Sequence, residues 1–437
     1  MSPVTEDTRT HDLVLYGATG FTGQLVAEYL LKTYGDTDLR LALAGRNESK
    51  LERVRRELTA AHPRAADLPL LVADSRDRVA LDAIAKETKA LCTTVGPYAK
   101  YGAEVVAACV EAGTDYSDLT GETQFIRRMI DAHHERAIET GARIVHCCGF
   151  DSIPSDLGTM LVQQTALERH GAPAREVKLA AGESSGAASG GTLASMFNLM
   201  EEVSRDRSVL KVLGHPYGLN PEGERSGLPD GGDQKGMRYD EDLGMWTAPF
   251  VMAAINTRVV RRSHALQGFP WGRDFRYSEV MSTGEGAGGV LRAAGITAGV
   301  GAFVGLAAVK PTRRLLQRYL PQPGEGPSEE ARERGFFVVR LVGLGEDADG
   351  QPFTVRVKVR GDKDPGYGGT AIMLGESAMT LATDDLDGPG GVLTPSTAMG
   401  DRLLERLRDA SMTFEVEGGE ATTKRAARSG KSAATTP

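Results

Sequence analysis

The chain has 437 residues, of which 41% are hydrophobic and 25% are charged. This length accommodates two domains, each with its own core. The formal net charge of −8 argues against nucleic acid as a main partner. Four cysteines with no zinc-type or disulfide-framework spacing favour reduced thiols. We expect a cytoplasmic protein whose polar residues 1–10 are disordered and carry no signal peptide.

A glycine turn follows the first apolar run, residues 11–16, and leads into an amphipathic stretch over residues 24–32. This order of strand, turn and helix is typical of a dinucleotide-binding fold. Glycines allow the chain to approach a pyrophosphate, and the helix directs free N–H groups at it. We expect the cofactor to contact this turn through Gly17, Thr19, Gly20, Phe21, Thr22 and Gly23.

A second predicted strand, residues 39–44, ends at Arg46, where an NAD site usually has an acidic residue for the ribose hydroxyl. A guanidinium suits a 2′-phosphate, so the sequence predicts NADP as cofactor. Asn47 and Lys50 are expected to assist Arg46. The alternative is an ordinary surface arginine at a helix start.

Strand-like and helix-like segments continue to alternate up to residue 148, which predicts a parallel, doubly wound sheet of the Rossmann type. Ligands of such sheets bind at the carboxyl ends of the strands. At those ends, we expect cofactor contacts from Asp74, Ser75, Gly96 and Pro97. The reacting end would be lined by Asp118, Gly121, Glu122 and residues 149–151.

Several motifs resemble those of the saccharopine dehydrogenase-like oxidoreductases. They are the glycine turn, Gly45-Arg46-Asn47, the segment Val95-Gly96-Pro97-Tyr98-Ala99-Lys100-Tyr101-Gly102 and the segment from Ala112 to Glu122. The run from Cys148 to Asp156 and a later glycine-rich helix resemble the trans-acting enoyl reductase subgroup. The resemblance implies a nicotinamide-binding domain, a second α+β domain for substrate and pairing, and a role in actinobacterial polyketide-lipid synthesis. It transfers no single catalytic residue.

The second half of the chain reads as an α+β domain. We place a Rossmann domain at residues 11–150, a substrate and dimerisation domain at 151–417, and a disordered basic tail at 418–437. The last helix of the second domain could pack back on the Rossmann domain. Two alternating segments, 336–343 and 353–360, predict a β-hairpin. Residues 214–244, rich in Gly, Pro and charge, predict a long surface loop or lid.

Residues 293–309 contain no charged side chain, and Lys310, Arg313 and Arg314 follow at once. Three interpretations stay open for this segment. It is a buried or dimer-interface helix, a helix inserted into a membrane surface with a basic collar, or a membrane span at the short end of the required length.

No metal-binding or hydrolase motif is visible, so the chemistry is expected to come from NADPH. For an enoyl thioester, hydride transfer to the β-carbon leaves a proton to be delivered to the α-carbon. Tyr98, Tyr101 and Lys100 are the predicted catalytic groups. We expect an acyl thioester on a polyketide synthase carrier as substrate and a homodimer as the assembly. The alternatives are a saccharopine-type amino-acid dehydrogenase, with Arg258, Arg261 and Arg262 for substrate carboxylates, and a non-catalytic NADP-binding scaffold at a membrane.

Overall fold

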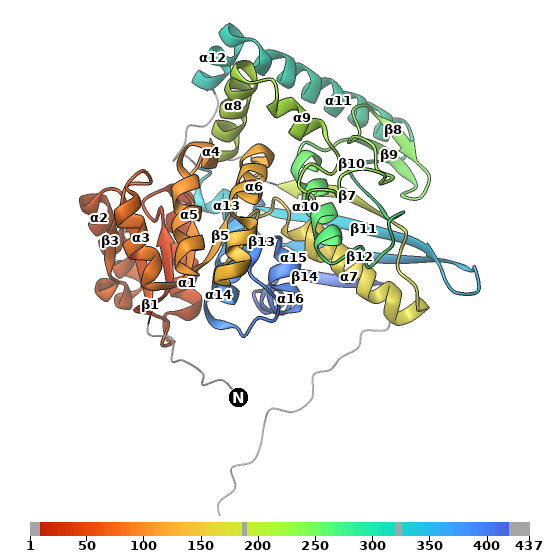
Figure 1. Ribbon diagram of the computed structural model, residues 1–437. Coiled ribbons are helices and arrows are strands. Elements are labelled where there is room, and N and C mark those ends of the chain that lie inside the picture. The colour runs from red at the N-terminus through yellow and green to blue at the C-terminus, as the bar shows by residue number, and fades with distance from the viewer. Residues whose placement is uncertain (1–8, 186–189, 320–325, 419–437) are drawn as a thin grey trace, which may run out of the picture.

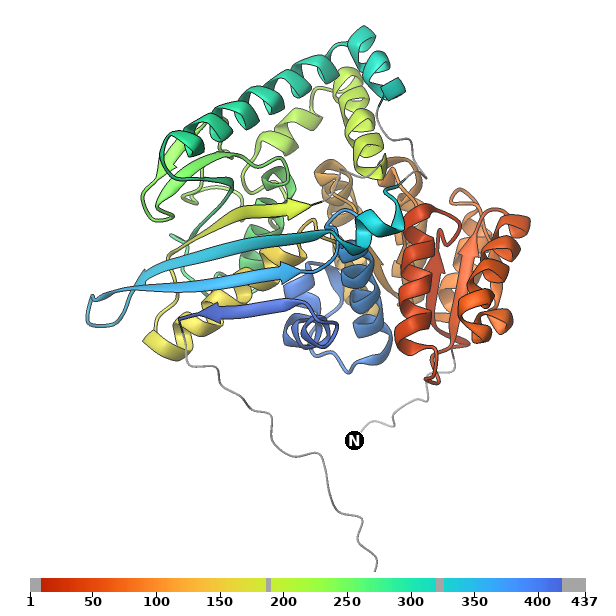
Figure 2. The same ribbon diagram turned by 180° about the vertical axis from the view of Figure 1, so that it is seen from behind.

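The structure is a computed structural model that describes residues 9–185, 190–319 and 326–418. Two sheets lie side by side, and helices cover both of them (Figures 1 and 2). The predicted disordered ends fall almost wholly outside the described residues. Arg9 is described, and its guanidinium donates to the carbonyl oxygens of Thr88 (2.7 Å), Ala112 (3.0 Å) and Gly113 (2.9 Å). The ordered chain therefore begins slightly before residue 11.

The first sheet has seven parallel strands in the order β13-β6-β5-β4-β1-β2-β3. Its strands are β1 (His11–Tyr16), β2 (Leu41–Gly45), β3 (Leu70–Val72), β4 (Thr88–Thr93), β5 (Asp115–Asp118), β6 (Arg143–Val145) and β13 (Gly391–Leu393). Leu13, Val14 and Leu15 of β1 are fully buried, as expected where helices cover both faces of a sheet. The predicted Rossmann-type α/β fold is confirmed.

Helices pack on both faces of this sheet. The connecting helices are α1 (Phe21–Tyr34), α2 (Glu48–Ala61), α3 (Arg78–Lys86), α4 (Tyr98–Tyr101), α5 (Ala103–Ala112) and α6 (Thr123–Thr140), with a 3₁₀ turn at Pro63–Asp67. One apolar core joins the sheet to α1, α2 and α14 (Gly368–Thr383), and a second core joins it to α3, α5 and α6.

The Rossmann sheet is not built from residues 11–150 alone. Strand β13 pairs with β6, so that Val392 lies beside Ile144, and α14 packs against α1 and β4. Both elements come from the part of the chain that the sequence analysis assigned to the second domain. The sequence analysis expected such a return of the last helix, whereas α14 is an earlier helix, and it did not expect the added strand. A three-residue strand, Gly391–Leu393, carries too little pattern to be recognised in a sequence.

The second sheet is mixed, in the order β14-β12-β11-β7-β10-β9-β8. Its strands are β7 (Glu176–Ser185), β8 (Arg238–Asp240), β9 (Met245–Pro249), β10 (Arg276–Gly284), β11 (Phe336–Glu346), β12 (Pro352–Gly361) and β14 (Thr413–Glu417). The predicted hairpin is present as β11 and β12, with Val339 opposite Val359. Among the strands described for this sheet, only β7 and β10 run parallel to each other.

The remaining helices surround the second sheet and link it to the first. They are α7 (Ile153–His170), α8 (Gly190–Arg205), α9 (Val209–Gly214), α10 (Ala253–Leu266), α11 (Gly286–Ala308), α12 (Lys310–Tyr319), α13 (Glu329–Glu333), α15 (Pro395–Ala398) and α16 (Gly400–Asp409). Helix α11 runs along the upper edge of the molecule in Figure 1, between β8–β9 at one end and α8 at the other. Helix α8 descends from it toward the Rossmann sheet (Figures 1 and 2).

Candidate cofactor and active site

The glycine turn after β1 requires glycine at two positions for steric reasons. Gly17 has a φ of +95°, and a Cβ on it would lie 2.7 Å from Val95 Cγ2. A Cβ on Gly23 would lie 2.2 Å from the carbonyl oxygen of Gly17. A side chain at either position would push the turn away from the start of α1. The turn is therefore held tightly against the helix.

The first turn of α1 has free backbone donors. Gly20 is the N-cap residue and offers no side chain, and no acceptor among the described residues takes the N–H of Phe21 or Thr22. Unsatisfied N–H groups at a helix N-terminus bind anions such as a pyrophosphate. This geometry fits the pyrophosphate of a dinucleotide.

The predicted 2′-phosphate site lies at the end of β2. Arg46 is exposed and forms no ion pair with any described residue. Its charge acts on the phenol of Tyr16, as does that of Asp74, so both residues lie at the same end of the sheet. Burial, followed by the Asp74 charge, raises the pKa of Tyr16 to about 12. Asn47 caps α2, because its Oδ1 accepts the N–H of Lys50 at 2.9 Å. An unpaired guanidinium beside this helix start is available to an anion.

Asp74 and Ser75 follow β3, where the adenosine end of the cofactor is expected. Asp74 is exposed, and its carboxylate accepts the N–H of Arg76 at 3.0 Å. Ser75 is buried. The guanidinium of Arg76 lies over the ring of Tyr101, 5.8 Å from the ring centre. The Tyr101 ring therefore lies beside the segment that follows β3.

A buried carboxylate links the reacting end of the Rossmann sheet to the second domain. Glu122 accepts the N–H groups of Tyr98 (2.8 Å) and Ala99 (2.9 Å), and the hydroxyl of Ser195 on α8 (2.8 Å). Burial raises the pKa of Glu122. The sequence analysis placed Glu122 in the wall of the site but did not foresee this capping of α4. The contact fixes the segment after Gly96 and Pro97 beneath α8.

The three predicted catalytic side chains differ in accessibility. The Tyr98 side chain is buried, its hydroxyl donates to the carbonyl oxygen of Thr93 at 3.1 Å, and burial raises its pKa well above the usual value. This geometry argues against Tyr98 as a proton donor to a substrate. Lys100 is exposed and Tyr101 is half-buried. Aromatic residues at a strand end pack into a core as readily as they line a site, and the Tyr98 ring packs into the core.

Comparison with known proteins places the chain in a family. Residues 13–145 match the family model described as the saccharopine dehydrogenase NADP-binding domain. A relative from Mycobacterium ulcerans named trans-acting enoyl reductase is 42% identical over 412 residues, covering 91% of this chain and 96% of its own. A protein of that name from Mycobacterium tuberculosis (strain H37Rv) is 40% identical over 419 residues, covering 93% of this chain and 97% of its own. The chain belongs to the trans-acting enoyl reductase subgroup of the saccharopine dehydrogenase-like family.

Among solved structures, a saccharopine dehydrogenase (L-Glu forming) from Saccharomyces cerevisiae is similar, with a TM-score of 0.48 and 16% identity over 93% of this chain and 99% of that one. The match to the NADP-binding domain agrees with the free Arg46 and with the glycine turn. The chain is an NADP-dependent oxidoreductase, as the sequence predicted.

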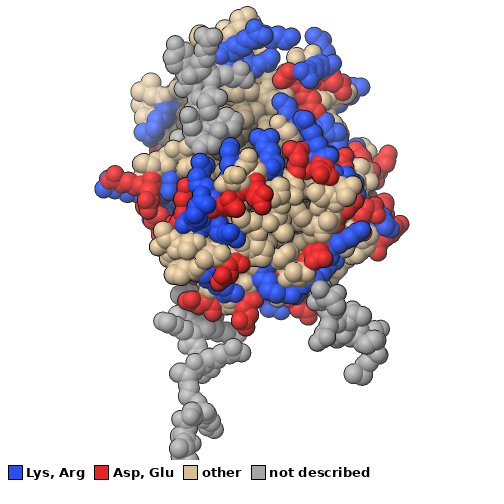
Figure 3. All heavy atoms as spheres, turned by 90° about the vertical axis from the view of Figure 1, so that its left-hand side faces the viewer, with Lys and Arg blue, Asp and Glu red and all other residues tan. Residues whose placement is uncertain are grey.

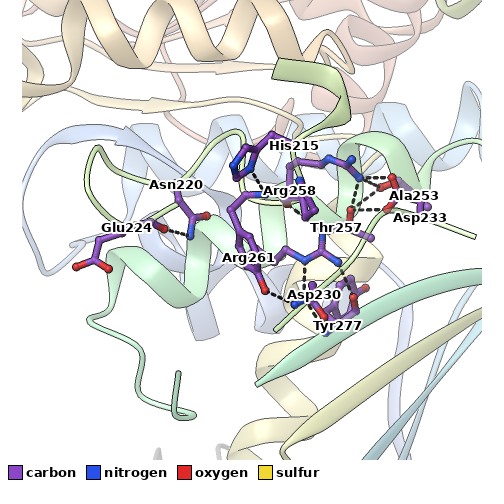
Figure 4. Close-up of polar contacts among 12 residues, drawn as sticks. His215, Asn220, Glu224, Asp230, Asp233, Ala253, Thr257, Arg258, Arg261 and Tyr277 are labelled. Carbon is purple, nitrogen blue, oxygen red and sulfur yellow. Dashed lines mark hydrogen bonds and ion pairs between the residues drawn. The ribbon is translucent and has the colours of Figure 1, made fainter. Parts of the chain in front are cut away.

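The three arginines that a saccharopine-type substrate would require are engaged elsewhere in this family member. Arg258 pairs with Asp233, and Arg261 Nε lies 2.6 Å from Asp230 Oδ2 (Figure 4). Arg262 is fully buried and donates to the carbonyl oxygens of Leu219 and Val392 (2.5 Å). These contacts bind residues 219–233 to α10. The predicted surface loop is thus anchored over part of its length, and none of the three guanidiniums is free for a substrate carboxylate.

Proposed function

We propose that this protein reduces the C=C bond of an enoyl thioester carried by a polyketide synthase, with NADPH as the reductant. The observation that supports the proposal most strongly is 40–44% identity, over more than nine-tenths of the chain, to relatives named trans-acting enoyl reductases. That name belongs to the relatives, and the substrate class comes to this chain as an inference. The position of α8 over the reacting end of the Rossmann sheet gives such a substrate a second wall.

The cofactor and the protein have separate roles in this reaction. When bound, NADPH supplies a hydride that adds to the β-carbon of the enoyl thioester. The glycine turn would hold the pyrophosphate of the cofactor, and Arg46 would hold its 2′-phosphate. It must also stabilise the enolate oxygen and deliver a proton to the α-carbon. Of the three predicted catalytic groups, the exposed Lys100 and the half-buried Tyr101 remain proposals for these tasks.

Consumption of NADPH with two kinds of substrate tests the proposal. We expect the purified protein to oxidise NADPH in the presence of crotonyl-coenzyme A, or of a crotonyl group on a polyketide synthase carrier domain. We expect no oxidation with a 2-oxo acid and an amino acid. The reverse pattern would favour the amino-acid dehydrogenase. Binding of NADPH without oxidation by any of these substrates, the carrier-bound one included, would favour the scaffold.

We further propose that α11 contacts an anionic membrane surface. Among the described residues of α11, only Gly289, Ala293 and Ala307 are buried, so the interpretation as a core helix is wrong. It is the one described helix long and apolar enough to cross a bilayer, and 11% of its most apolar 18-residue window is buried. Its exposed apolar side chains are Leu291, Val304 and Leu306, and Val309 follows the helix.

The charge at the end of α11 suits an anionic partner. Lys310 and Arg314 on α12 are exposed, whereas Arg313 is buried and donates to the carbonyl oxygen of Ala307 at 3.3 Å. Blue side chains gather at the top of Figure 3, at the end of the molecule where α12 lies. A cation near an anionic surface contributes about 1 kcal/mol. The inner side of the helix packs on Leu193 and Phe197 of α8, which favours lying in the surface over crossing it.

Flotation with vesicles separates a membrane contact from a dimer contact. Val304→Asp combined with Val309→Asp should abolish flotation with vesicles containing phosphatidylglycerol, and salt should weaken flotation of the unaltered protein. Val79→Asp, an exposed side chain on helix α3 of the Rossmann domain, is the control. If the unaltered protein fails to float at low salt, the membrane proposal is wrong. If the unaltered protein is a dimer and the paired substitution dissociates it, this face instead contacts a second copy of the chain.

A further inference from the structure

The loop that connects β6 to α7, residues 146–152, has an unusual backbone. Cys147 has a φ of +63° and Ser152 a φ of +109°, both in the left-handed region although neither is glycine. Such conformations persist only where surrounding contacts enforce them, and they are concentrated at functional sites. The loop leaves the Rossmann sheet at the carboxyl end of β6 and enters the first helix of the second domain.

Hydrogen bonds from three elements hold the loop. Asp118 at the end of β5 accepts the Cys148 N–H on its carbonyl oxygen (2.7 Å) and the Cys147 N–H on its carboxylate (3.2 Å). The other carboxylate oxygen of Asp118 lies 2.7 Å from His146 Nδ1. The Phe150 N–H donates to the Thr370 hydroxyl of α14 (3.1 Å), and the Ser152 hydroxyl donates to Asn256 Oδ1 of α10 (2.9 Å).

Asp151 is the exception within this well-bonded loop. Asp151 is half-buried, and none of the described residues forms a hydrogen bond or ion pair with its carboxylate. The carboxylate faces the loop after β5, because a Cβ on Gly121 would lie 3.6 Å from Asp151 Oδ2. That Cβ would also lie 3.9 Å from Ile255 Cγ2, at the start of α10. A carboxyl group is thus presented, without a partner, at the carboxyl edge of the Rossmann sheet, where ligands of this fold bind.

We propose that Asp151 is the general acid that delivers the proton to the α-carbon of the enoyl thioester. This inference rests on the proposed reduction. As the hydride adds to the β-carbon, the π electrons of the C=C bond move toward the thioester carbonyl and form an enolate. The enolate collapses, a C–H bond forms at the α-carbon, and the O–H bond of Asp151 breaks. The resulting carboxylate regains its proton from solvent on its exposed side.

The surroundings of Asp151 favour a carboxyl group that still carries its proton near neutral pH. Burial, followed by the charge of Glu279 on β10, raises the pKa of Asp151 to about 7. Burial also raises the pKa of Glu279 to about 7, although it accepts hydrogen bonds from Tyr277 (2.8 Å) and Asn256 (2.9 Å). The acidic residues at the end of β5 and in the loop after it are Asp118 and Glu122, both bonded as described above. A general acid is most effective when its pKa lies close to the working pH.

Asp151→Asn tests the proposal, because the amide keeps the shape of the side chain and lacks the acidic proton. With crotonyl-coenzyme A as the probe, we expect kcat to fall by about a hundredfold or more. The Kd for NADPH, measured by fluorescence titration, should stay within about twofold of that of the unaltered protein. Asp387→Asn, an exposed aspartate beyond α14, is the control and should change neither quantity. Thermal melts of each variant verify that it is folded.

The pH profile distinguishes a proton donor from a structural residue. In the unaltered protein, kcat should decline as the pH rises through about 7, since deprotonated Asp151 cannot donate. Asp151→Glu should restore part of the rate, and Glu279→Gln should move the decline to lower pH by removing a negative charge. If Asp151→Asn keeps both the rate and the profile, the proposal is wrong while the proposed function stands. If the unaltered protein reduces no enoyl thioester, free or carrier-bound, both are wrong.

Discussion

At the scale of single residues, the cofactor preference depends on Arg46. The residue follows the buried strand β2, is exposed, and lies where the ribose of a dinucleotide is expected. Its guanidinium forms no ion pair with the described residues, so binding of a 2′-phosphate would break no existing contact. This part of the site could be read from the sequence, because the distance from the glycine turn to the end of β2 is set by one helix and one strand.

Arg46→Asp should weaken NADPH binding far more than NADH binding, because a carboxylate repels the 2′-phosphate but can accept the 2′-hydroxyl. Loss of a charge-assisted contact costs about 2 kcal/mol, or roughly thirtyfold in Kd. Fluorescence titration with both cofactors measures the change. Arg53→Asp, further along α2 and exposed in a weak pair with Glu57, serves as the control. Equal weakening of both cofactors by Arg46→Asp would show that Arg46 does not bind the phosphate.

Alanine substitutions at two glycines of the turn should have different effects on stability and on cofactor binding. A Cβ on Gly20 would lie 3.4 Å from the Gly17 carbonyl oxygen, so Gly20→Ala should lower the free energy of unfolding by only about 1 kcal/mol. It should nevertheless abolish NADPH binding by occupying the pyrophosphate position. Gly23→Ala places its Cβ 2.2 Å from the same oxygen and should destabilise the protein by about 2 kcal/mol. Thermal melts and titrations of both variants measure this contrast, and unimpaired NADPH binding by Gly20→Ala would contradict the assignment.

The orientation of the Tyr98 and Glu122 side chains could not be predicted from the sequence. Tyr98 was assigned to catalysis because it follows β4, but its ring enters the core and its hydroxyl is bonded to Thr93. Glu122 was expected to line the site, yet it caps α4 and contacts Ser195, more than seventy positions away. Which way a side chain at a strand end points depends on partners that are distant in the sequence, and no local pattern encodes them.

At the scale of elements, buried charge explains how the long segment before β8 is held. The segment contributes Asp230 and Asp233, and α10 contributes Arg258 and Arg261 (Figure 4). The side chains of Arg261 and Asp230 are 5% and 8% exposed. The sequence presented these arginines as free cations on a helix, because their acidic partners lie in a region without periodicity.

Arg261→Met should destabilise the protein strongly, since it leaves the Asp230 carboxylate buried without its partner. Breaking a buried pair in this way costs about 3–5 kcal/mol. Arg273→Met removes an exposed pair with Glu224, whose side chains are 52% and 39% exposed, and should cost about 1 kcal/mol or less. Denaturant titration of both variants gives the two free energies. Similar values for the two would show that the Arg261 pair is not what anchors the segment.

At the scale of the whole molecule, the chain does not build one sheet completely before the other. Residues 368–393 return to the Rossmann sheet after the second sheet has been largely built, and β14 then completes the second sheet. The sequence predicted the fold class and most of the long helices and strands, because long helices and alternating strands have strong periodicity. It did not predict that β13 joins the Rossmann sheet, which depends on pairing between residues more than 240 positions apart, such as Arg143 and Gly391.

The most direct test of the central claim is the fate of a deuterium label. Crotonyl-coenzyme A, or a crotonyl carrier domain, is reduced with NADPH that carries deuterium at both C4 positions of the nicotinamide, and the acyl product is examined by mass spectrometry and NMR. The account predicts one deuterium at the β-carbon and a solvent proton at the α-carbon. An unlabelled β-carbon, or a label in the product of a 2-oxo acid and an amine, would contradict it.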